Sequence, residues 1–131
     1  MTINTENWQE RMAADRHIHE LGIQLLDARQ GYAKTAITIT EKHLNGMGAT
    51  HGGVVFTLAD YAFATACNAE RDPSVAATVT ISFLKATQKG DTLTATCTVD
   101  KQGGRMGFYD IQITNQKGGL VASAKGTSCT L

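Results

Sequence analysis

Five segments of the chain alternate between apolar and polar residues with a period of two, which is typical of a half-buried β-strand. The alternation predicts strands over residues 36–40, 77–84, 92–99, 108–114 and 120–128. A further strand is expected over 23–27, with Gly31 in the turn that joins it to the strand after it. Glycine-containing breaks at 89–91, 103–104 and 117–119 separate the later strands. The pattern therefore indicates an antiparallel sheet with short turns.

Residues 53–69 depart from this pattern, because they are almost wholly apolar and form a run longer than a typical strand. They predict a helix that is buried on nearly all sides and that ends before Pro73. An amphipathic helix is predicted over residues 5–19. The expected fold class is α+β, with a strongly curved antiparallel sheet wrapped around a long central helix and a short N-terminal helix. Because one small sheet cannot cover so apolar a helix, part of it is expected to face another chain.

The composition limits the class of protein. The chain has 131 residues, is 42% hydrophobic and carries 12 basic and 12 acidic side chains. This length fits one domain over residues 1–131. A formal net charge of zero argues against a nucleic-acid binder with a broad basic face. Small molecules and copies of the same chain are the expected partners.

Cysteine usage and the N-terminal residues indicate the compartment. Cys67, Cys97 and Cys129 are far apart and odd in number, so they cannot form a closed disulfide framework. The polar N-terminus does not resemble a secretory signal. Asp60 interrupts the longest apolar run, so no membrane span is expected. We therefore expect a cytoplasmic protein with reduced thiols and no membrane or nucleic-acid partner.

A glycine-punctuated polar loop precedes the apolar helix, and this helix carries one carboxylate, Asp60. Backbone N–H groups at a helix N-terminus favour developing negative charge, and Gly52 and Gly53 leave room for a carbonyl to approach them. Asp60 is suited to act as a base or a nucleophile. Asn45 and His51 are polar groups that can orient a substrate carbonyl or the loop itself. The layout indicates an acyl-transfer site.

Each of these residues also has a purely structural explanation. Asp60 could bond to a distant backbone N–H or lie at an exposed edge. The glycines could serve the turn alone, and a single histidine is more often structural than catalytic. The free-energy cost of burying Asp60 argues against a purely structural role, because a carboxylate in an apolar helix loses hydration unless it is paired or lines a wet cavity.

The spacing of Gly52 and Asp60 bears on the number of chains in the site. They are eight positions apart, which is about 12 Å on a straight helix that rises about 1.5 Å per residue. One reacting carbonyl cannot touch both. If two such helices run antiparallel across a two-fold axis, Asp60 of one chain meets Gly52 of the other. We therefore predict composite sites, two in each dimer.

Other catalytic arrangements receive little support. The sequence has no Gly-x-Ser-x-Gly elbow, no phosphate-binding Gly-x-x-x-x-Gly-Lys-Ser/Thr loop and no His-Glu-x-x-His helix. His17 and His19 form the one close histidine pair and have no further ligands nearby in sequence, so no metal site is predicted. The cysteines are expected to be core residues rather than nucleophiles.

The loop and helix together resemble one family. The residues that carry the likeness are Asn45-Gly46, His51-Gly52-Gly53 and Leu58-Ala59-Asp60, with Ala62-Phe63-Ala64 and Ala66-Cys67-Asn68 after them. They resemble the phenylacetic acid degradation branch of the hotdog thioesterases. The likeness continues through residues 80–85, 90–93 and 103–111, so it spans most of the chain.

This resemblance implies the hotdog fold and assigns roles to the candidate residues. Asp60 would activate water or attack the thioester, and the Gly52 N–H would be the oxyanion donor. Asn45 and His51 would position the thioester and the loop, and Thr78 is the nearest hydroxyl that would hold the water. The family further implies a homodimer with one continuous sheet, often doubled to a homotetramer, and no cofactor beyond the coenzyme A (CoA) part of the substrate.

Two sets of residues are candidates for substrate contacts. Basic side chains could meet the CoA phosphates, namely Lys85, Lys89 and Arg105. The acyl pocket could be lined by Gly53, Phe56, Tyr61 and Phe63, although aromatic residues on a buried helix are more often core.

The expected function is hydrolysis of acyl-CoA thioesters to a free acid and CoA. Phenylacetyl-CoA or its hydroxylated relatives are the first choice of substrate, with medium-chain acyl-CoA as the alternative. Two other functions stay open at this point: a non-catalytic acyl-CoA binding module or sensor, and a hotdog acyl-CoA dehydratase.

Overall fold

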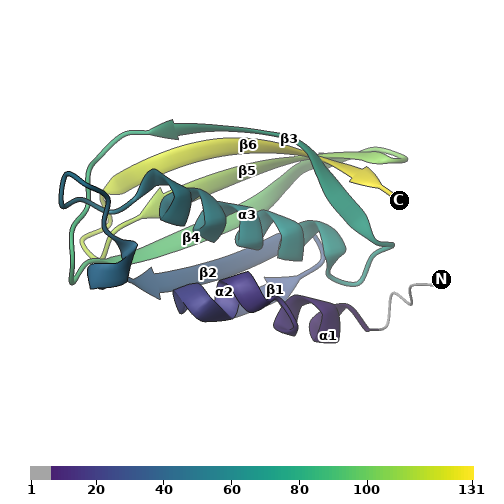
Figure 1. The fold of residues 1–131 in the computed structure, drawn as a ribbon. Helices are drawn as coiled ribbons and strands as arrows, with labels where there is room; N and C mark the ends of the chain where they lie inside the picture. The colour runs from purple at the N-terminus through teal and green to yellow at the C-terminus, as the bar shows by residue number, and fades with distance from the viewer. Residues whose placement is uncertain (1–6) are drawn as a thin grey trace.

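The computed structural model describes residues 7–131. Its helices are α1 (Trp8–Ala13), α2 (Arg16–Leu21) and α3 (Gly52–Asn68), and a 3-10 turn, η2, spans Glu41–His43. Its strands are β1 (Gln24–Arg29), β2 (Tyr32–Thr38), β3 (Ser74–Phe83), β4 (Thr92–Gln102), β5 (Met106–Thr114) and β6 (Leu120–Thr130). The strands pair antiparallel in one sheet with the order β1-β2-β4-β5-β6-β3. Figure 1 shows this sheet arched over α3, with α1 and α2 near β1 and β2.

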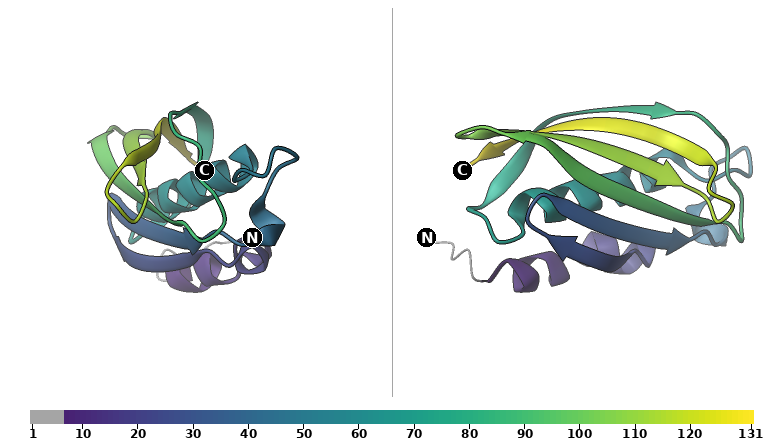
Figure 2. Two further views of the ribbon diagram at one scale, coloured as in Figure 1. Left: turned by 90° about the vertical axis from the view of Figure 1, so that its left-hand side faces the viewer. Right: turned by 180° about the vertical axis from the view of Figure 1, so that it is seen from behind.

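The core lies between α3 and the inner face of the sheet, which curls around the helix (Figure 2). The ring of Phe63 on α3 packs against the ring of Tyr109 on β5, with the centroids 5.3 Å apart. Gly126 on β6 makes this close approach possible, because a Cβ atom there would lie 2.8 Å from the Phe63 ring. Tight packing of this kind fixes the position of α3 along the sheet.

The predicted strands all form, and the expected curved sheet around a central helix is confirmed. Three strands begin earlier than the alternation indicates, β5 by two residues at Met106 and the other two by three or more, at Tyr32 and at Ser74. The chain enters β2 directly after the predicted turn at Gly31, which has a φ of +77°. At the start of β3, the side chain of Asn68 accepts a hydrogen bond from the Ser74 N–H at 2.9 Å and donates one to the Ser74 carbonyl at 3.0 Å. This pair of bonds fixes the turn between α3 and β3.

The predicted N-terminal helix over 5–19 is wrong in its continuity, since the described part forms two short helices. The break falls at Ala14 and Asp15. The Asp15 carboxylate accepts from the Ile18 N–H at 3.3 Å and so caps α2. Both helices rest on the core through buried Trp8 and Ile18. Residues 5 and 6 of the prediction lie outside the described residues.

The sheet leaves one side of α3 open. Phe56, Thr57, Asp60 and Ala64 are half-buried, whereas the residues between them are buried. Helical spacing places these four along one stripe, and their partial exposure assigns this stripe to the uncovered side of the helix. Figure 2 shows that the sheet curls around α3 without enclosing it. The adjacent strand β3 is an edge of the sheet, and its residues 75–78 are exposed. No helix within residues 7–131 is long and apolar enough to cross a membrane.

Candidate functional site

The loop before α3 is organised by the side chain of Asn45. Its Oδ1 accepts from the Met47 N–H at 2.8 Å and from the Ala49 N–H at 3.2 Å. Backbone bonds close the same loop, with the Asn45 N–H donating to the Ala49 carbonyl at 2.7 Å. Asn45 Nδ2 makes no hydrogen bond within residues 7–131, so it remains a free donor beside the loop. Asn45 therefore shapes the loop, as the sequence predicts, and keeps one donor for a ligand.

His51 caps the N-terminus of α3 and separates the roles of the two glycines. Its Nδ1 accepts from the Gly53 N–H at 2.9 Å, which places the proton of the neutral ring on Nε2. The Val54 N–H bonds to the His51 carbonyl at 2.9 Å. The Gly52 N–H is the first of the helix and has no acceptor in the described part of the chain. Gly52, rather than Gly53, is thus the open donor at the positive end of the helix dipole.

We expect the His51→Ala variant to lower the free energy of unfolding by about 1 kcal/mol, because it removes the cap of α3. Thermal or denaturant unfolding measures this. The His51→Asn variant is the matched control, since asparagine is a good N-cap and should restore most of the loss. If His51→Ala is as stable as the wild type, the cap does not contribute to stability as described.

Asp60 lies half-buried on the open stripe of α3. Within residues 7–131 its carboxylate accepts no hydrogen bond and forms no ion pair, so no distant backbone N–H explains its position. Burial raises the pKa of Asp60, and the nearby Asp15 carboxylate raises it further. A carboxyl group with a raised pKa and free lone pairs is suited to take a proton from water.

A groove of about 350 Å³ begins at Gly52. It is lined by Asn45, Ala49, Thr50, Gly52, Val55, Phe83, Leu84, Lys85, Ala86, Thr87 and Val121. Three of the predicted site residues, Asn45, Gly52 and Lys85, therefore meet in one groove. Asp60 does not line it, in agreement with the eight-residue separation on α3.

Phe83 is a groove residue that the sequence reasoning missed. Its ring carbons lie 3.5–4.0 Å from the position that a Cβ atom on Gly52 would take, and the side chain is 56% exposed. The sequence places Phe83 at the end of an alternating strand, where it reads as one more inward-facing apolar residue. Only the crossing of β3 over the start of α3 brings its ring beside the open N–H.

The other candidates for substrate contacts are divided by the fold. Gly53 and Phe56 lie on or near the open side of α3. Tyr61 and Phe63 are 6% and 1% exposed and belong to the core of the protomer. The hydroxyl of Tyr61 donates to the Met12 carbonyl at 2.9 Å, which ties α3 to the N-terminal helices. The role of these two aromatic residues in an acyl pocket stays a prediction.

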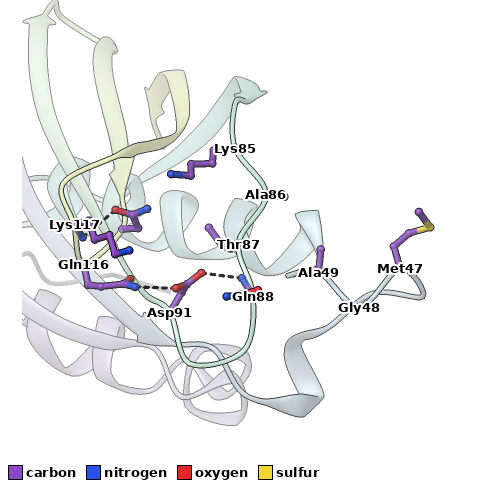
Figure 3. A pocket seen from close by; sticks show the side chains of 11 residues that line it. Met47, Gly48, Ala49, Lys85, Ala86, Thr87, Gln88, Asp91, Gln116 and Lys117 are labelled. Carbon is purple, nitrogen blue, oxygen red and sulfur yellow. Dashed lines mark hydrogen bonds between the residues drawn. The ribbon is translucent and has the colours of Figure 1, made fainter.

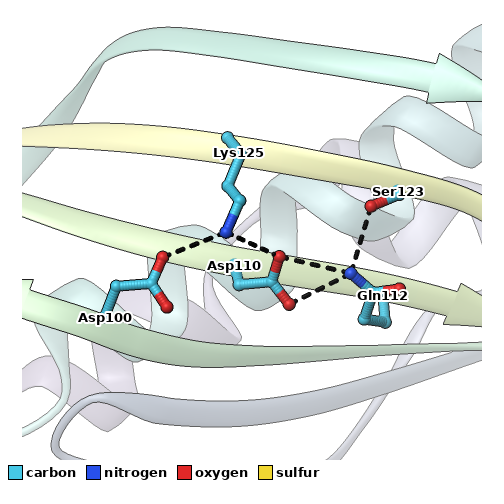
Figure 4. Close-up of polar contacts among 5 residues, drawn as sticks. All are labelled: Asp100, Asp110, Gln112, Ser123 and Lys125. Carbon is cyan, nitrogen blue, oxygen red and sulfur yellow. Dashed lines mark hydrogen bonds and ion pairs between the residues drawn. The ribbon is translucent and has the colours of Figure 1, made fainter.

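Thr78 and Arg105 lie away from the groove in this protomer. Thr78 is exposed and pairs with Thr127, two positions from the Thr80–Lys125 pair. Lys125 bridges two aspartates on the outer face of the sheet (Figure 4), and alternation puts Thr78 on that same face. Arg105 lies in the β4–β5 hairpin and donates to the Thr130 carbonyl at 3.3 Å. Their predicted contacts with water and phosphate stay predictions.

Two of the three cysteines, Cys67 and Cys97, are buried core residues as predicted, whereas Cys129 is only partly buried. Burial raises the pKa of Cys67 to about 12, and it also raises the pKa of Cys97, so both thiols are poor nucleophiles at neutral pH. His17 and His19 are exposed, and a ring nitrogen of His19 bonds to the Ala13 carbonyl. Residues 7–131 hold no group of three or more His, Cys, Asp or Glu side chains that could bind a metal ion.

Comparison with known proteins places this geometry in a family. Residues 47–122 match the family model of the thioesterase superfamily. The chain is 44% identical to the acyl-coenzyme A thioesterase PaaI of Escherichia coli K12 over 124 residues, which cover 92% of this chain and 89% of that protein.

Solved structures agree with this match. The structure of the E. coli PaaI protein from the phenylacetic acid degradation operon has a TM-score of 0.92 at 41% identity, covering 96% of this chain and 91% of that one. The structure of smu.793 from Streptococcus mutans UA159 bound to acetyl CoA has a TM-score of 0.80 at 26% identity, covering 84% and 89%. The chain therefore belongs to the thioesterase superfamily and has its hotdog fold.

Proposed function

We propose that this protein hydrolyses acyl-CoA thioesters, as its relatives named acyl-CoA thioesterases do. The observation that carries the proposal is the open N–H of Gly52 at the start of α3, facing a groove, with an unpaired carboxylate farther along the uncovered side of the same helix. The first supplies a donor for an oxyanion, and the second supplies a base. Acyl transfer to water needs both.

The reaction follows from these two groups. The thioester carbonyl accepts a hydrogen bond from the Gly52 N–H. This hydrogen bond polarises the carbonyl carbon and stabilises the oxyanion that forms. Asp60 of the partner protomer takes a proton from water while the water oxygen attacks that carbon. The carbon–sulfur bond then breaks, and the proton passes from Asp60 to the departing CoA sulfur. Direct attack by the Asp60 carboxylate is the alternative first step. The route uses only this chain, water and the substrate.

The proposed dimer brings the two groups together. An antiparallel pair of α3 helices that sets Gly52 opposite Asp60 has its two-fold axis at the midpoint, residue 56. Phe56 is half-exposed on the open stripe, so the two Phe56 side chains would meet at the axis. The unpaired edge of β3 lies beside this stripe and would extend the sheet from one protomer into the next. A second dimer could complete a tetramer.

Release of CoA from a panel of thioesters tests the activity. We expect turnover of phenylacetyl-CoA, with straight-chain medium-length acyl-CoA esters as the comparison, and specificity constants rank the acyl groups. Binding without release of CoA would indicate a sensor. Conversion of a hydroxyacyl-CoA to its enoyl form would indicate a dehydratase. Cell fractionation tests the expected cytoplasmic location separately.

Complementation between two inactive variants tests the composite site. The Asp60→Asn chain keeps Gly52, and the Gly52→Pro chain keeps Asp60. In a heterodimer, one site combines both lesions and the other has neither. Co-expression of the two chains with different tags, followed by tandem purification, should therefore give activity approaching half that of the wild type per heterodimer. If each site lies within one chain, both sites stay defective and mixing restores nothing.

A further inference from the structure

A pocket of about 230 Å³, here called the Arg71 pocket, lies beyond the C-terminal end of α3. It is lined by Gln30, Gly31, Arg71, Val99, Gln102 and Tyr109. The groove at Gly52, and the pocket in Figure 3 that shares residues 85–87 with it, lie at the other end of this helix. Because α3 has 17 residues, about 25 Å of helix separates the two ends at a rise of about 1.5 Å per residue. The Arg71 pocket is therefore separate from the groove of the same protomer.

The guanidinium group of Arg71 forms no ion pair within residues 7–131, although Glu70 and Asp72 are its neighbours in sequence. Its Nε atom is buried and makes no hydrogen bond in the described part of the chain. Buried charged donors are normally paired, because loss of hydration without an acceptor is costly. An unpaired guanidinium on the wall of a pocket is thus suited to an anionic ligand.

The turn between α3 and β3 fixes the backbone that carries Arg71. The Arg71 N–H donates to the Asn68 carbonyl at 3.3 Å. The side chain of Asn68 in turn holds Ser74 by two hydrogen bonds. Between them, Glu70 has a left-handed backbone conformation with a φ of +54°, which few non-glycine residues adopt. The Arg71 side chain therefore extends from a turn that is held at both ends.

Gly31 joins three elements at the base of the pocket. Its N–H donates to the Ala66 carbonyl on α3 at 3.1 Å, and its carbonyl accepts from the Val99 N–H on β4 at 2.8 Å. A Cβ atom on Gly31 would lie 2.8 Å from Val99 Cγ1, so the valine side chain packs directly on the β1–β2 turn. This part of the pocket is preformed and apolar.

Tyr109 contributes an aromatic ring and a neutral hydroxyl. The hydroxyl donates to Gln102 Oε1 at 3.2 Å, and Gln102 Nε2 donates to the carbonyls of Gly103 and Met106. Burial raises the pKa of Tyr109 to about 12, whereas the charge of Arg71 acts in the opposite direction. The hydroxyl is therefore protonated at neutral pH, and Tyr109 adds no negative charge that could satisfy the guanidinium.

The charge and the size of the pocket limit the class of ligand. The planar guanidinium group matches the two oxygens of a carboxylate or of a phosphate. Arg71 is the one basic residue among those that line the pocket, so a dianionic phosphate would keep an uncompensated charge. The volume lies below the range of about 300–1,000 Å³ that is usual for drug-sized ligands. A small monoanion with an apolar body fits both limits.

We propose that the Arg71 pocket binds a small organic monocarboxylate. Its two oxygens accept hydrogen bonds from the Arg71 guanidinium, and its apolar part lies against Val99 and the ring of Tyr109. Gln30 is a further donor, because its Nε2 makes only a long bond of 3.5 Å to the Glu70 carbonyl. The free acids that thioester hydrolysis releases belong to this class of ligand, but the site does not depend on the proposed function.

Titration of the full chain with phenylacetate, followed by residue-resolved amide NMR spectra, tests the site. We expect the Gly31 and Arg71 amide signals to shift and to saturate in the wild type. In Arg71→Gln the same signals should report an affinity about tenfold or more lower, because the charged donor is lost. Arg71→Lys should bind with intermediate affinity, because it keeps the charge without the planar pair of donors. Any signals near Gly52 that shift should do so equally in all three proteins.

Two further ligands and one further variant serve as controls. Phenylacetamide has nearly the same shape without the charge and should leave the Gly31 signal unchanged. Inorganic phosphate should bind more weakly than phenylacetate. Arg16→Gln removes the same side chain from an exposed position on α2 and should bind as the wild type does. Equal affinity in Arg71→Gln, shifts confined to the groove, or equal binding of phenylacetamide or phosphate would overturn the proposal.

Discussion

The Asp60→Asn variant is expected to reduce kcat by about 10²–10⁴-fold, the usual contribution of a positioned acid or base. The amide has nearly the shape of the carboxylate but cannot take a proton from water or attack the thioester. CoA release under saturating substrate measures the change. CoA binding should persist, because the groove at Gly52 does not include Asp60. A variant that keeps full turnover would remove Asp60 from the mechanism.

The same substitution should not destabilise the protein at neutral pH. Burial raises the pKa of Asp60 above its ordinary value, so the folded state favours the protonated acid and the ionised form carries a penalty. The wild type should therefore lose stability relative to Asp60→Asn as pH rises through the folded pKa. The two should converge at pH values below the ordinary aspartate range. Unfolding curves over this pH series separate the catalytic loss from a folding defect.

The raised pKa also sets the direction of the pH–rate profile. Asp60 must be ionised to act as a base, so the acidic limb of kcat/KM should lie above the ordinary aspartate pKa of 3.8. In the Asp60→Asn variant this limb should disappear from any residual rate. A limb that persists unchanged would belong to another group.

The Gly52→Pro variant is expected to reduce kcat by about 10²–10³-fold, because it removes the one backbone donor left open at the start of α3. Proline suits this position structurally. Gly52 is the first residue of the helix, where the N–H makes no helical bond. His51 before it is already extended, with φ −62° and ψ 132°, as a residue before proline prefers. The fold should therefore survive.

Gly52→Ala is the matched control, since it adds a Cβ atom but keeps the N–H. That Cβ would lie 3.5 Å from the Phe83 ring, an ordinary contact. We expect Gly52→Ala to keep most of the turnover, and the ratio of the two variants then reports the N–H alone. Equal loss in both would show that space beside Phe83, rather than the donor, is what Gly52 provides.

Much of the fold and of the candidate site could be predicted from the chain itself. The two-residue alternation identified five of the six strands, the turn at Gly31 indicated the other, and the long apolar run identified α3 to within one residue at each end. The chemistry was also local, because Asn45, His51 and Gly52 are neighbours in sequence and their bonds close within one loop. Periodicity and turn chemistry act over a few residues, so a sequence reports them directly.

Other features depended on which distant segments meet. The N-terminal helix divides at Asp15, where capping outweighs a weak apolar pattern. In the sequence, Tyr61 and Phe63 are aromatic residues close to Asp60 and therefore candidates for an acyl pocket. In the structure, the packing of Phe63 on Tyr109 and the hydrogen bond from Tyr61 to Met12 place both in the core.

Thr78, Phe83 and Lys117 show the same dependence on the tertiary structure. The register of β3 on β6 faces Thr78 outward, and the course of β3 carries Phe83 over Gly52. The β5–β6 turn brings Lys117 to a pocket that Lys85 also lines. The sequence alone determined the elements and the candidate reactive groups, because these follow from local spacing and chemistry. The tertiary structure decided which of those groups share a cavity, because the order of strands in a sheet is set by packing between distant segments.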